Sequence, residues 1–281
     1  MSPPDDADDL RGYYFRLLLG KTGIRLALGA AALAGFAAGT LLASPAIGAA
    51  GLAAATLVAL LVVFGVADSR SEDAFFEMYG QRREMVAFGR SCVPEATPLL
   101  RKGDDRYAEH MLEGPLGEGI DGLLALYTYE EETSNGKSTQ TNYYRYTVGL
   151  IEAPECADFI PELYCQRKFG LRALEGLEDV FRRSKERVKL ESEALDERYE
   201  IFAAKGEDAN RPRQLFSPTF IVWLTDSAPE KFAFELVDGT FCCYVSGHKK
   251  TAAELDAVRA SATAVARRLR EEALESPPRR A

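Results

Sequence analysis

The feature that most constrains this chain is a run of 42 residues, 26–67, without a charged side chain. As one helix the run would be roughly 63 Å long at 1.5 Å per residue. That is about twice the roughly 30 Å thickness of a bilayer's hydrocarbon core, so the run must fold back on itself. Proline disfavours helix at the residue before it, and Pro45 lies near the middle of the run. We expect a transmembrane hairpin of two helices, at about 24–43 and 47–67.

Small residues recur at four-residue spacing in both expected helices, at Gly35 and Gly39 in the first and at Gly51 and Ala55 in the second. This spacing lets helix backbones approach closely in lipid. It predicts that the two helices pack on each other, with association between whole chains as the alternative. Neither span contains an ionisable residue, which argues against a transporter or a proton channel.

Basic residues flank the outer ends of the hairpin. Four precede it and four follow it: Arg11, Arg16, Lys21, Arg25, Arg70, Arg82, Arg83 and Arg90. The positive-inside rule then predicts that both termini lie in the cytoplasm. The "ASPA" stretch after the first span could pass for a signal-peptide cleavage site. However, the first nine residues contain four aspartates, whereas a signal peptide begins with a short basic leader.

Composition argues against several classes of function. The net charge of −9 is unfavourable for binding nucleic acid, which requires many basic side chains to neutralise phosphates. The five cysteines are odd in number and show no repeated close pairing, so we interpret them as reduced cytosolic thiols. His110 and His248 are the only histidines. Few metal or hydrolytic sites can be built from so few, and we expect no catalytic, cofactor or metal-binding residue.

Behind the hairpin the sequence predicts an α+β domain of antiparallel β-hairpins with packed helices. We divide the rest of the chain into a cytoplasmic tail (1–23), a juxtamembrane helix over 70–90 with a linker (together 68–105), the soluble domain (106–273) and a disordered tail (274–281). Within the domain we expect short strands at 162–168, 187–190 and 198–204, helices at 171–184 and 218–224, and a last amphipathic helix that begins with a capping box at Thr251 and Glu254.

A first β-hairpin is predicted around Asn135-Gly136, because Asn-Gly is the strongest short-range hairpin signal. With these as the two turn residues, position i pairs with position 271 − i. One side of the pair then carries an aromatic set: Tyr127, Tyr129, Tyr144 and Tyr146. We favour a cross-strand aromatic ladder. The alternative is an interaction surface or pocket for a ligand or a partner.

A second β-hairpin is predicted around Asp238-Gly239, where position i pairs with position 477 − i. This register places Cys243 in the core, and Cys242 opposite Glu235 on the more hydrated face. Successive residues of a strand point to opposite faces. The two thiols therefore cannot easily hold one metal ion together with His248.

Two nucleotide-like motifs fail on their context. The letters GKST at 136–139 have Glu131 where a P-loop requires its first glycine, and a β-rich run follows them instead of a helix. The G-x-G-x-x-G pattern at 117–122 likewise precedes a strand. We therefore expect no nucleotide binding.

The run "RVKLESEALDERYEIFAAKGEDANRPRQLFSPTFIVWLTD" at 187–226, followed by the apolar hairpin at Asp238-Gly239, resembles an uncharacterised bacterial family, the domain of unknown function numbered thirty-one thirty-seven. The resemblance covers about 140–250. It implies two N-terminal membrane helices with a soluble domain behind them, and it carries over no catalytic residue. The segment "EALD" at 193–196 departs from the family's usual pattern.

These features, together with the resemblance, predict a protein anchored by two spans in a bacterial plasma (inner) membrane, with a cytoplasmic domain that has no enzymatic activity. We expect it to contact the lipid bilayer and to bind a protein partner, act as a scaffold or self-associate. The alternative is an enzyme or small-ligand sensor with a tyrosine-lined pocket in the first hairpin.

Overall fold

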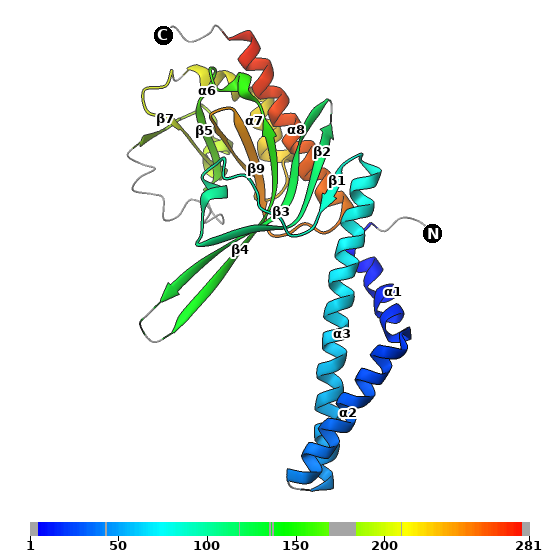
Figure 1. Cartoon of the computed structure of the whole chain (residues 1–281). Helices are drawn as coiled ribbons and strands as arrows, with labels where there is room; N and C mark the ends of the chain where they lie inside the picture. The colour runs from blue at the N-terminus through cyan, green and yellow to red at the C-terminus, as the bar shows by residue number, and fades with distance from the viewer. Residues whose placement is uncertain are drawn as a thin grey trace. The chain divides into compact units, whose positions relative to one another are not determined.

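The computed structural model describes residues 5–42, 44–117, 119–134, 136, 138–168, 184–208 and 210–276. It divides into two compact units. The first, here called the helical unit, comprises the chain up to Tyr79 together with Lys250–Ala252. The second, here called the sheet domain, comprises Gly80–Lys249 and Ala253–Ala281. Figure 1 traces the chain through both units.

The helical unit contains the helices α1 (Ala7–Gly20), α2 (Thr22–Leu42) and α3 (Pro45–Arg82). The first of these occupies the segment that the sequence assigned to an N-terminal tail. A capping box starts it: the Asp6 side chain accepts from the Asp8 amide, and the Asp9 carboxylate accepts from the Asp6 amide. The apolar side chain of Leu18 then packs against Val63 and Ala67 of α3.

Helices α2 and α3 are in direct backbone contact, which their glycines permit. A Cβ atom on Gly35 would lie 2.4 Å from the carbonyl oxygen of Gly51 and 2.7 Å from the Cβ of Ala55. A Cβ on Gly39 would lie 2.5 Å from the carbonyl oxygen of Ile47. The four small residues singled out in the sequence therefore lie where the two helices meet.

Helix α3 runs past the end of the apolar segment and stops earlier than the helix expected over 70–90. It ends at Arg82, and Glu84 takes a φ of 59° in the turn that follows. The next residues form the short strand β1 (Val86–Phe88), which pairs with β2 (Asp105–Gly117).

The sheet domain is built on one antiparallel sheet, which confirms the predicted α+β class. Among the described residues the strand order is β1-β2-β3-β4-β9-β8-β5-β7-β6. The remaining strands are β3 (Ile120–Ser134), β4 (Thr139–Glu152), β5 (Glu162–Arg167), β6 (Lys185–Arg187), β7 (Tyr199–Ala204), β8 (Ala233–Val237) and β9 (Thr240–Ser246).

The register of the first hairpin differs from the expected one by two residues. Tyr127 pairs with Tyr146, and Tyr129 pairs with Tyr144, so position i pairs with 273 − i. The last pair before the turn is Ser134 with Thr139, so the connection has four residues instead of the two predicted. A shift by two keeps every side chain on its predicted face, because side chains alternate with a period of two.

The second hairpin has the predicted register, with Glu235 opposite Cys242 and Phe234 opposite Cys243. The expectation that Cys242 faces water is wrong, because both thiols are fully buried. The face that carries Cys242 is covered by the segment 91–102, here called the strap. In the chain the strap follows β1 and precedes β2, and it contains a 3₁₀ turn, Leu99–Arg101. Its residues Val93, Leu99 and Leu100 pack in the same cluster as Cys242.

Helices cover the opposite face of the sheet. The long helix α8 (Ala252–Glu275) lies across it (Figure 1). The helix packs closely on β4, because a Cβ atom added to Gly149 would lie 3.2 Å from the Cβ of Ala262. The shorter helices are α5 (Glu193–Arg198), α6 (Asn210–Leu215) and α7 (Pro218–Val222), which Ser217 caps. The helix expected at 171–184 lies almost entirely outside the described residues.

Candidate functional site

The four tyrosines of the first hairpin form a ladder in the core. The ring of Tyr129 stacks on Tyr144 with centroids 4.8 Å apart, and on Tyr146 at 6.0 Å. Tyr127 and Tyr129 are 1% exposed and Tyr146 is 4% exposed. Leu99 and Leu100 of the strap belong to the same cluster. Three of the four rings are thus withdrawn from solvent, so the structure does not present this set as an open interaction surface.

A carboxyl group is buried beneath the strap, at Glu235 of the central strand β8. Its Oε2 accepts from the Leu99 amide at 3.2 Å, and its Oε1 accepts from the Tyr244 hydroxyl at 3.5 Å. Burial raises the pKa of this carboxyl from 4.5 to about 7, while these hydrogen bonds and the charge of Lys102 act in the lowering direction. The sequence pattern places Glu235 opposite Cys242 on the hydrated face and does not predict its burial, since an acid in an amphipathic strand is expected to face water.

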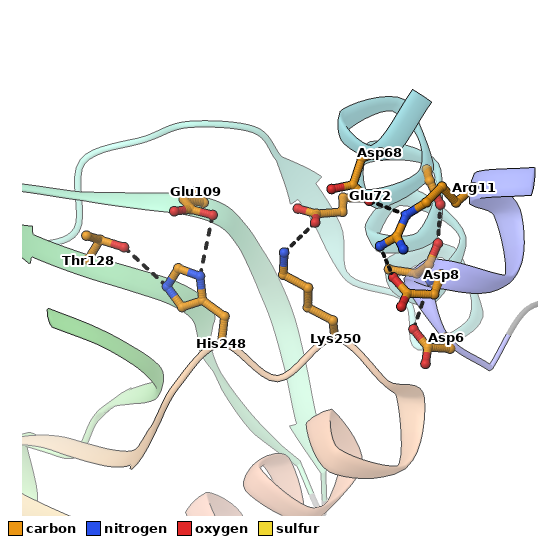
Figure 2. Close-up of polar contacts among 11 residues, drawn as sticks. Asp6, Asp8, Arg11, Asp68, Glu72, Glu109, Thr128, His248 and Lys250 are labelled. Carbon is orange, nitrogen blue, oxygen red and sulfur yellow. Dashed lines mark hydrogen bonds and ion pairs between the residues drawn. The ribbon is translucent and has the colours of Figure 1, made fainter. Parts of the chain in front are cut away.

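A second polar group is assembled around His248, directly after β9. The Nδ1 atom of His248 lies 3.4 Å from Oε2 of Glu109, and its Nε2 atom lies 3.2 Å from the hydroxyl of Thr128 (Figure 2). Carboxylate, imidazole and hydroxyl in this order resemble the triad of a hydrolase. The sequence did not indicate it, because the three residues are far apart in the chain and come from different elements.

Two observations show that this group is structural. Thr128 is fully buried, and the His248 side chain is only 5% exposed, so a substrate carbonyl cannot reach the hydroxyl. In addition, the Nε2 atom lies 3.1 Å from the carbonyl oxygen of Tyr127. The Tyr127 carbonyl can only accept, so whenever Nε2 carries a hydrogen this carbonyl competes with the Thr128 hydroxyl for it. The group fastens the end of β9 to β2 and β3.

Lys250–Ala252, which follow shortly after His248, belong to the helical unit. The Lys250 ammonium forms an ion pair with Glu72 of α3, and the Lys250 carbonyl accepts from the Ala7 amide at 3.1 Å. On α1, Arg11 forms ion pairs with Asp8 and with Asp68 of α3 (Figure 2). Within the helical unit, Lys250 is thereby held against α1 and α3.

The tip of the β3–β4 hairpin extends beyond its neighbours as a two-stranded arm (Figure 1). Pairing of β2 with β3 stops at Glu130, and pairing of β4 with β9 starts at Tyr146. Among the strands that the structure describes, the paired segments 131–134 and 139–142 therefore have only each other as neighbours. We call the described residues of 131–145 the arm. It includes Tyr143, which is 51% exposed.

An open hollow of about 700 Å³ lies at the opposite end of the first strands, where Gly114, Asp121 and Glu152 line it. The guanidinium of Arg270 from α8 also lines the hollow, and it already has partners. Its Nε lies 2.6 Å from Oε1 of Glu155, and its Nη2 donates to the Glu152 carbonyl at 2.9 Å. Among the described residues, no group of three or more His, Cys, Asp or Glu side chains is placed to hold a metal ion.

Comparison with known proteins adds little to this geometry. No model of a known protein family matches the sequence, and no curated protein matches it. Among solved structures, the crystal structure of the mycobacterial trehalose monomycolate transport factor A, TtfA, covers 75% of this chain and 99% of its own. The two are 10% identical with a TM-score of 0.45, a level of similarity from which we draw no conclusion about function.

Proposed function

We propose that the helical unit anchors this protein in a bacterial inner membrane through α2 and α3, and that the sheet domain is a non-enzymatic protein-binding module in the cytoplasm. One observation carries the anchor. Only 6% and 11% of the residues in the apolar windows of α2 and α3 are buried, and Leu26, Leu41 and Leu57 are 70%, 87% and 60% exposed. Water disfavours such surface by about 25 cal/mol per Å², whereas a bilayer accepts it.

The dimensions and charges of the hairpin support the same proposal. The 21 residues of α2 extend over roughly 31 Å at 1.5 Å per residue, which matches a hydrocarbon core of about 30 Å. The backbone contact between Gly35 and Gly51 is the close approach that small residues allow in lipid. The basic residues lie outside the uncharged run 26–67, at its two outer ends, which favours cytoplasmic termini.

The arm is the element that we propose for protein binding. The Gly247 amide donates to the carbonyl of Arg145 at 2.8 Å, so the backbone groups of Arg145 point away from β3. Alternate residues of a strand point the same way, which directs the backbone groups of Thr141 and Tyr143 outward as well. Pairing of β4 with β9 covers only Tyr146–Glu152, and these outward groups form an open edge.

The sequence of this edge is unusual for a strand that is left open. Residues 138–144, "STQTNYY", contain no charge and no proline, the two devices by which proteins usually prevent edge strands from pairing. An unprotected edge of this kind is suited to accept a partner's strand by β-augmentation. We therefore assign the arm to a partner polypeptide that adds a strand along β4.

The anchor and its orientation are tested with one cysteine. Cys92 is exposed, whereas Cys156, Cys165, Cys242 and Cys243 are buried. In intact cells, a membrane-impermeant maleimide should leave the protein unlabelled until the inner membrane is permeabilised. Cys92→Ser is the control and should remain unlabelled throughout. Labelling of Cys92 before permeabilisation would overturn the orientation, and release of the protein by alkaline carbonate would overturn the anchor.

The arm is tested by photo-crosslinking in native membranes with a benzophenone side chain at position 143. We expect a discrete adduct that disappears in Thr141→Pro, because proline removes an outward donor without removing a β3–β4 hydrogen bond. Thr141→Val, which keeps the amide, is the matched control and should retain the adduct. An adduct that survives Thr141→Pro contradicts strand addition, and an adduct of twice the chain's mass identifies a second copy as the partner.

A further inference from the structure

We infer that the second half of α1 and the start of α2 form a binding site for anionic phospholipid headgroups, with Arg16, Lys21 and Arg25 as its cations. This inference rests on the membrane anchor proposed above. The site would make α1 an interfacial helix that lies on the lipid surface, in addition to the two helices that enter the bilayer.

The charge pattern supports a negatively charged ligand. From Leu10 to Ala67 the sequence has no aspartate or glutamate, and its basic residues are Arg11, Arg16, Lys21 and Arg25. Arg11 is engaged by Asp8 and Asp68. None of the ion pairs found among the described residues involves the other three cations. They are all exposed, so their charge is available to a ligand at the surface.

The packing of α1 places these cations at the boundary of the apolar segment. Leu18 of α1 contacts Val63 and Ala67 of α3, the last turns of the uncharged run. The chain then turns at Lys21 and enters α2. At this corner the Nε atom of Arg25 donates to the carbonyl oxygen of Leu19 at 2.7 Å, which holds the guanidinium beside the end of α1.

An apolar strip accompanies the cations on α1. Tyr13 is 54% exposed and Leu17 is 44% exposed. Residues four apart lie on the same face of a helix, and Arg16 lies beside them. Tyrosine is enriched at the boundary between headgroups and acyl chains, and an amphipathic helix with basic and apolar side chains on adjoining faces is typical of an interfacial helix.

The acids near the other end of α1 do not cancel this charge. Asp68 and Glu72 of α3 form ion pairs with Arg11 and Lys250 respectively, and Asp8 and Asp9 lie in the first turn of α1. The helix has 14 residues, so its ends are roughly 21 Å apart at 1.5 Å per residue. That separation exceeds the roughly 8 Å over which charges act at physiological salt.

A phospholipid surface, rather than free phosphate, is favoured because cations and apolar side chains occur together. Phosphate diesters accept hydrogen bonds from guanidinium and ammonium groups. Each basic residue near an anionic surface contributes about 1 kcal/mol, or roughly fivefold in affinity. Loss of all three cations should therefore remove most of the preference for anionic lipid.

The test uses the full chain in vesicles and compares spin-labelled phosphatidylglycerol with spin-labelled phosphatidylcholine in the motionally restricted lipid shell. We expect a phosphatidylglycerol preference of several-fold that falls to about 1 in the triple variant Arg16→Gln, Lys21→Gln, Arg25→Gln. The matched control removes three exposed cations of the sheet domain, Lys189→Gln, Lys205→Gln and Arg213→Gln, and should keep the wild-type preference. Equal preference in the wild type and the first triple variant would overturn the site.

The depth of α1 is measured separately. Tyr13→Trp in a Trp223→Phe background provides a single fluorophore, and lipids brominated near the headgroup should quench it more strongly than lipids brominated deep in the acyl chain. Quenching by neither lipid would overturn the interfacial position of α1. Carbonate extraction reports on α2 and α3 alone, so failure of the anchor is distinguished from failure of this site.

Discussion

The backbone amide of Leu99 donates a hydrogen bond to Oε2 of Glu235 across 136 residues of sequence, at 3.2 Å. This bond joins the strap to the central strand β8. The Glu235 side chain is fully buried, as are Leu99 and Leu100 above it. Because burial raises the pKa of the carboxyl to about 7, the strap is fastened by a group whose charge changes near neutral pH.

Glu235 should make the stability of the protein depend on pH. In the unfolded chain its pKa returns to about 4.5, so between about pH 4.5 and 7 the folded protein holds a proton that the unfolded chain has lost. The free energy of unfolding therefore falls as the pH rises through this window, by about 3 kcal/mol in total. In Glu235→Gln this fall should be absent, while the amide oxygen still accepts from Leu99. Urea unfolding at several pH values, followed by Trp223 fluorescence, measures the difference.

An exposed acid provides the control for this experiment. Glu186→Gln removes a carboxylate from the exposed strand β6 and should retain the pH dependence of the wild type. If Glu235→Gln and the wild type lose stability equally between about pH 5 and 8, the buried carboxyl is not the titrating group.

The contact between α2 and α3 should be sensitive to a single methyl group. In Gly35→Ala the new Cβ would lie 2.4 Å from the Gly51 carbonyl oxygen, so the helices must separate, and we expect a loss of about 1–3 kcal/mol. Gly65→Ala meets no atom within 4 Å. Since alanine favours helix by about 1 kcal/mol over glycine, this control should be neutral or stabilising. Thermal unfolding in detergent, followed by helical circular dichroism, compares them, and equal melting of the two variants would refute the contact.

The two hairpins show how much of this fold local sequence determines. At Asp238-Gly239 the turn has two residues, and the pairing of Glu235 with Cys242 followed directly from it. At Asn135-Gly136 four residues connect the strands instead of two. The same dipeptide signal therefore predicted a register that differs by two residues from the observed one. The strand β2 was missed because a register shift between Ala108 and Met111 interrupts its alternation of apolar and polar side chains.

The polar groups of the sheet domain could not be predicted from sequence, for a different reason. Glu235 and Cys242 lie on a face that would be hydrated if the strap did not cross it, and no local pattern reveals that covering. His248 meets Glu109 and Thr128 only after β2, β3 and β9 are assembled, since Thr128 is 120 residues distant in the chain. Such contacts depend on the order of strands in the sheet, which periodicity does not encode.

The group around His248 should contribute to stability rather than to catalysis. Thr128→Val removes the hydroxyl that lies 3.2 Å from Nε2 but keeps the bond to the Tyr127 carbonyl, so we expect a loss of about 1 kcal/mol. His248→Ala removes both contacts as well as one partner of Glu109, and it should cost more, about 2 kcal/mol or above. Urea unfolding measures both. A Thr128→Val variant with unchanged stability would show that the hydroxyl has no structural role and reopen the question of chemistry at this residue.

The cysteines should differ sharply in reactivity. Burial raises the pKa of Cys156 and of Cys243 to about 12, and it raises the pKa of Cys165 and Cys242 as well, so these thiols remain protonated at pH 8 and are also shielded from reagents. Cys92 is exposed. Titration of the native protein in mild detergent with a chromogenic disulfide at pH 8 should therefore detect one thiol, and titration in guanidinium chloride should detect five. In Cys92→Ser the native count should fall to zero. A native count of two or more would mean that the strap, or the helices on the other face of the sheet, leave the core open to small reagents.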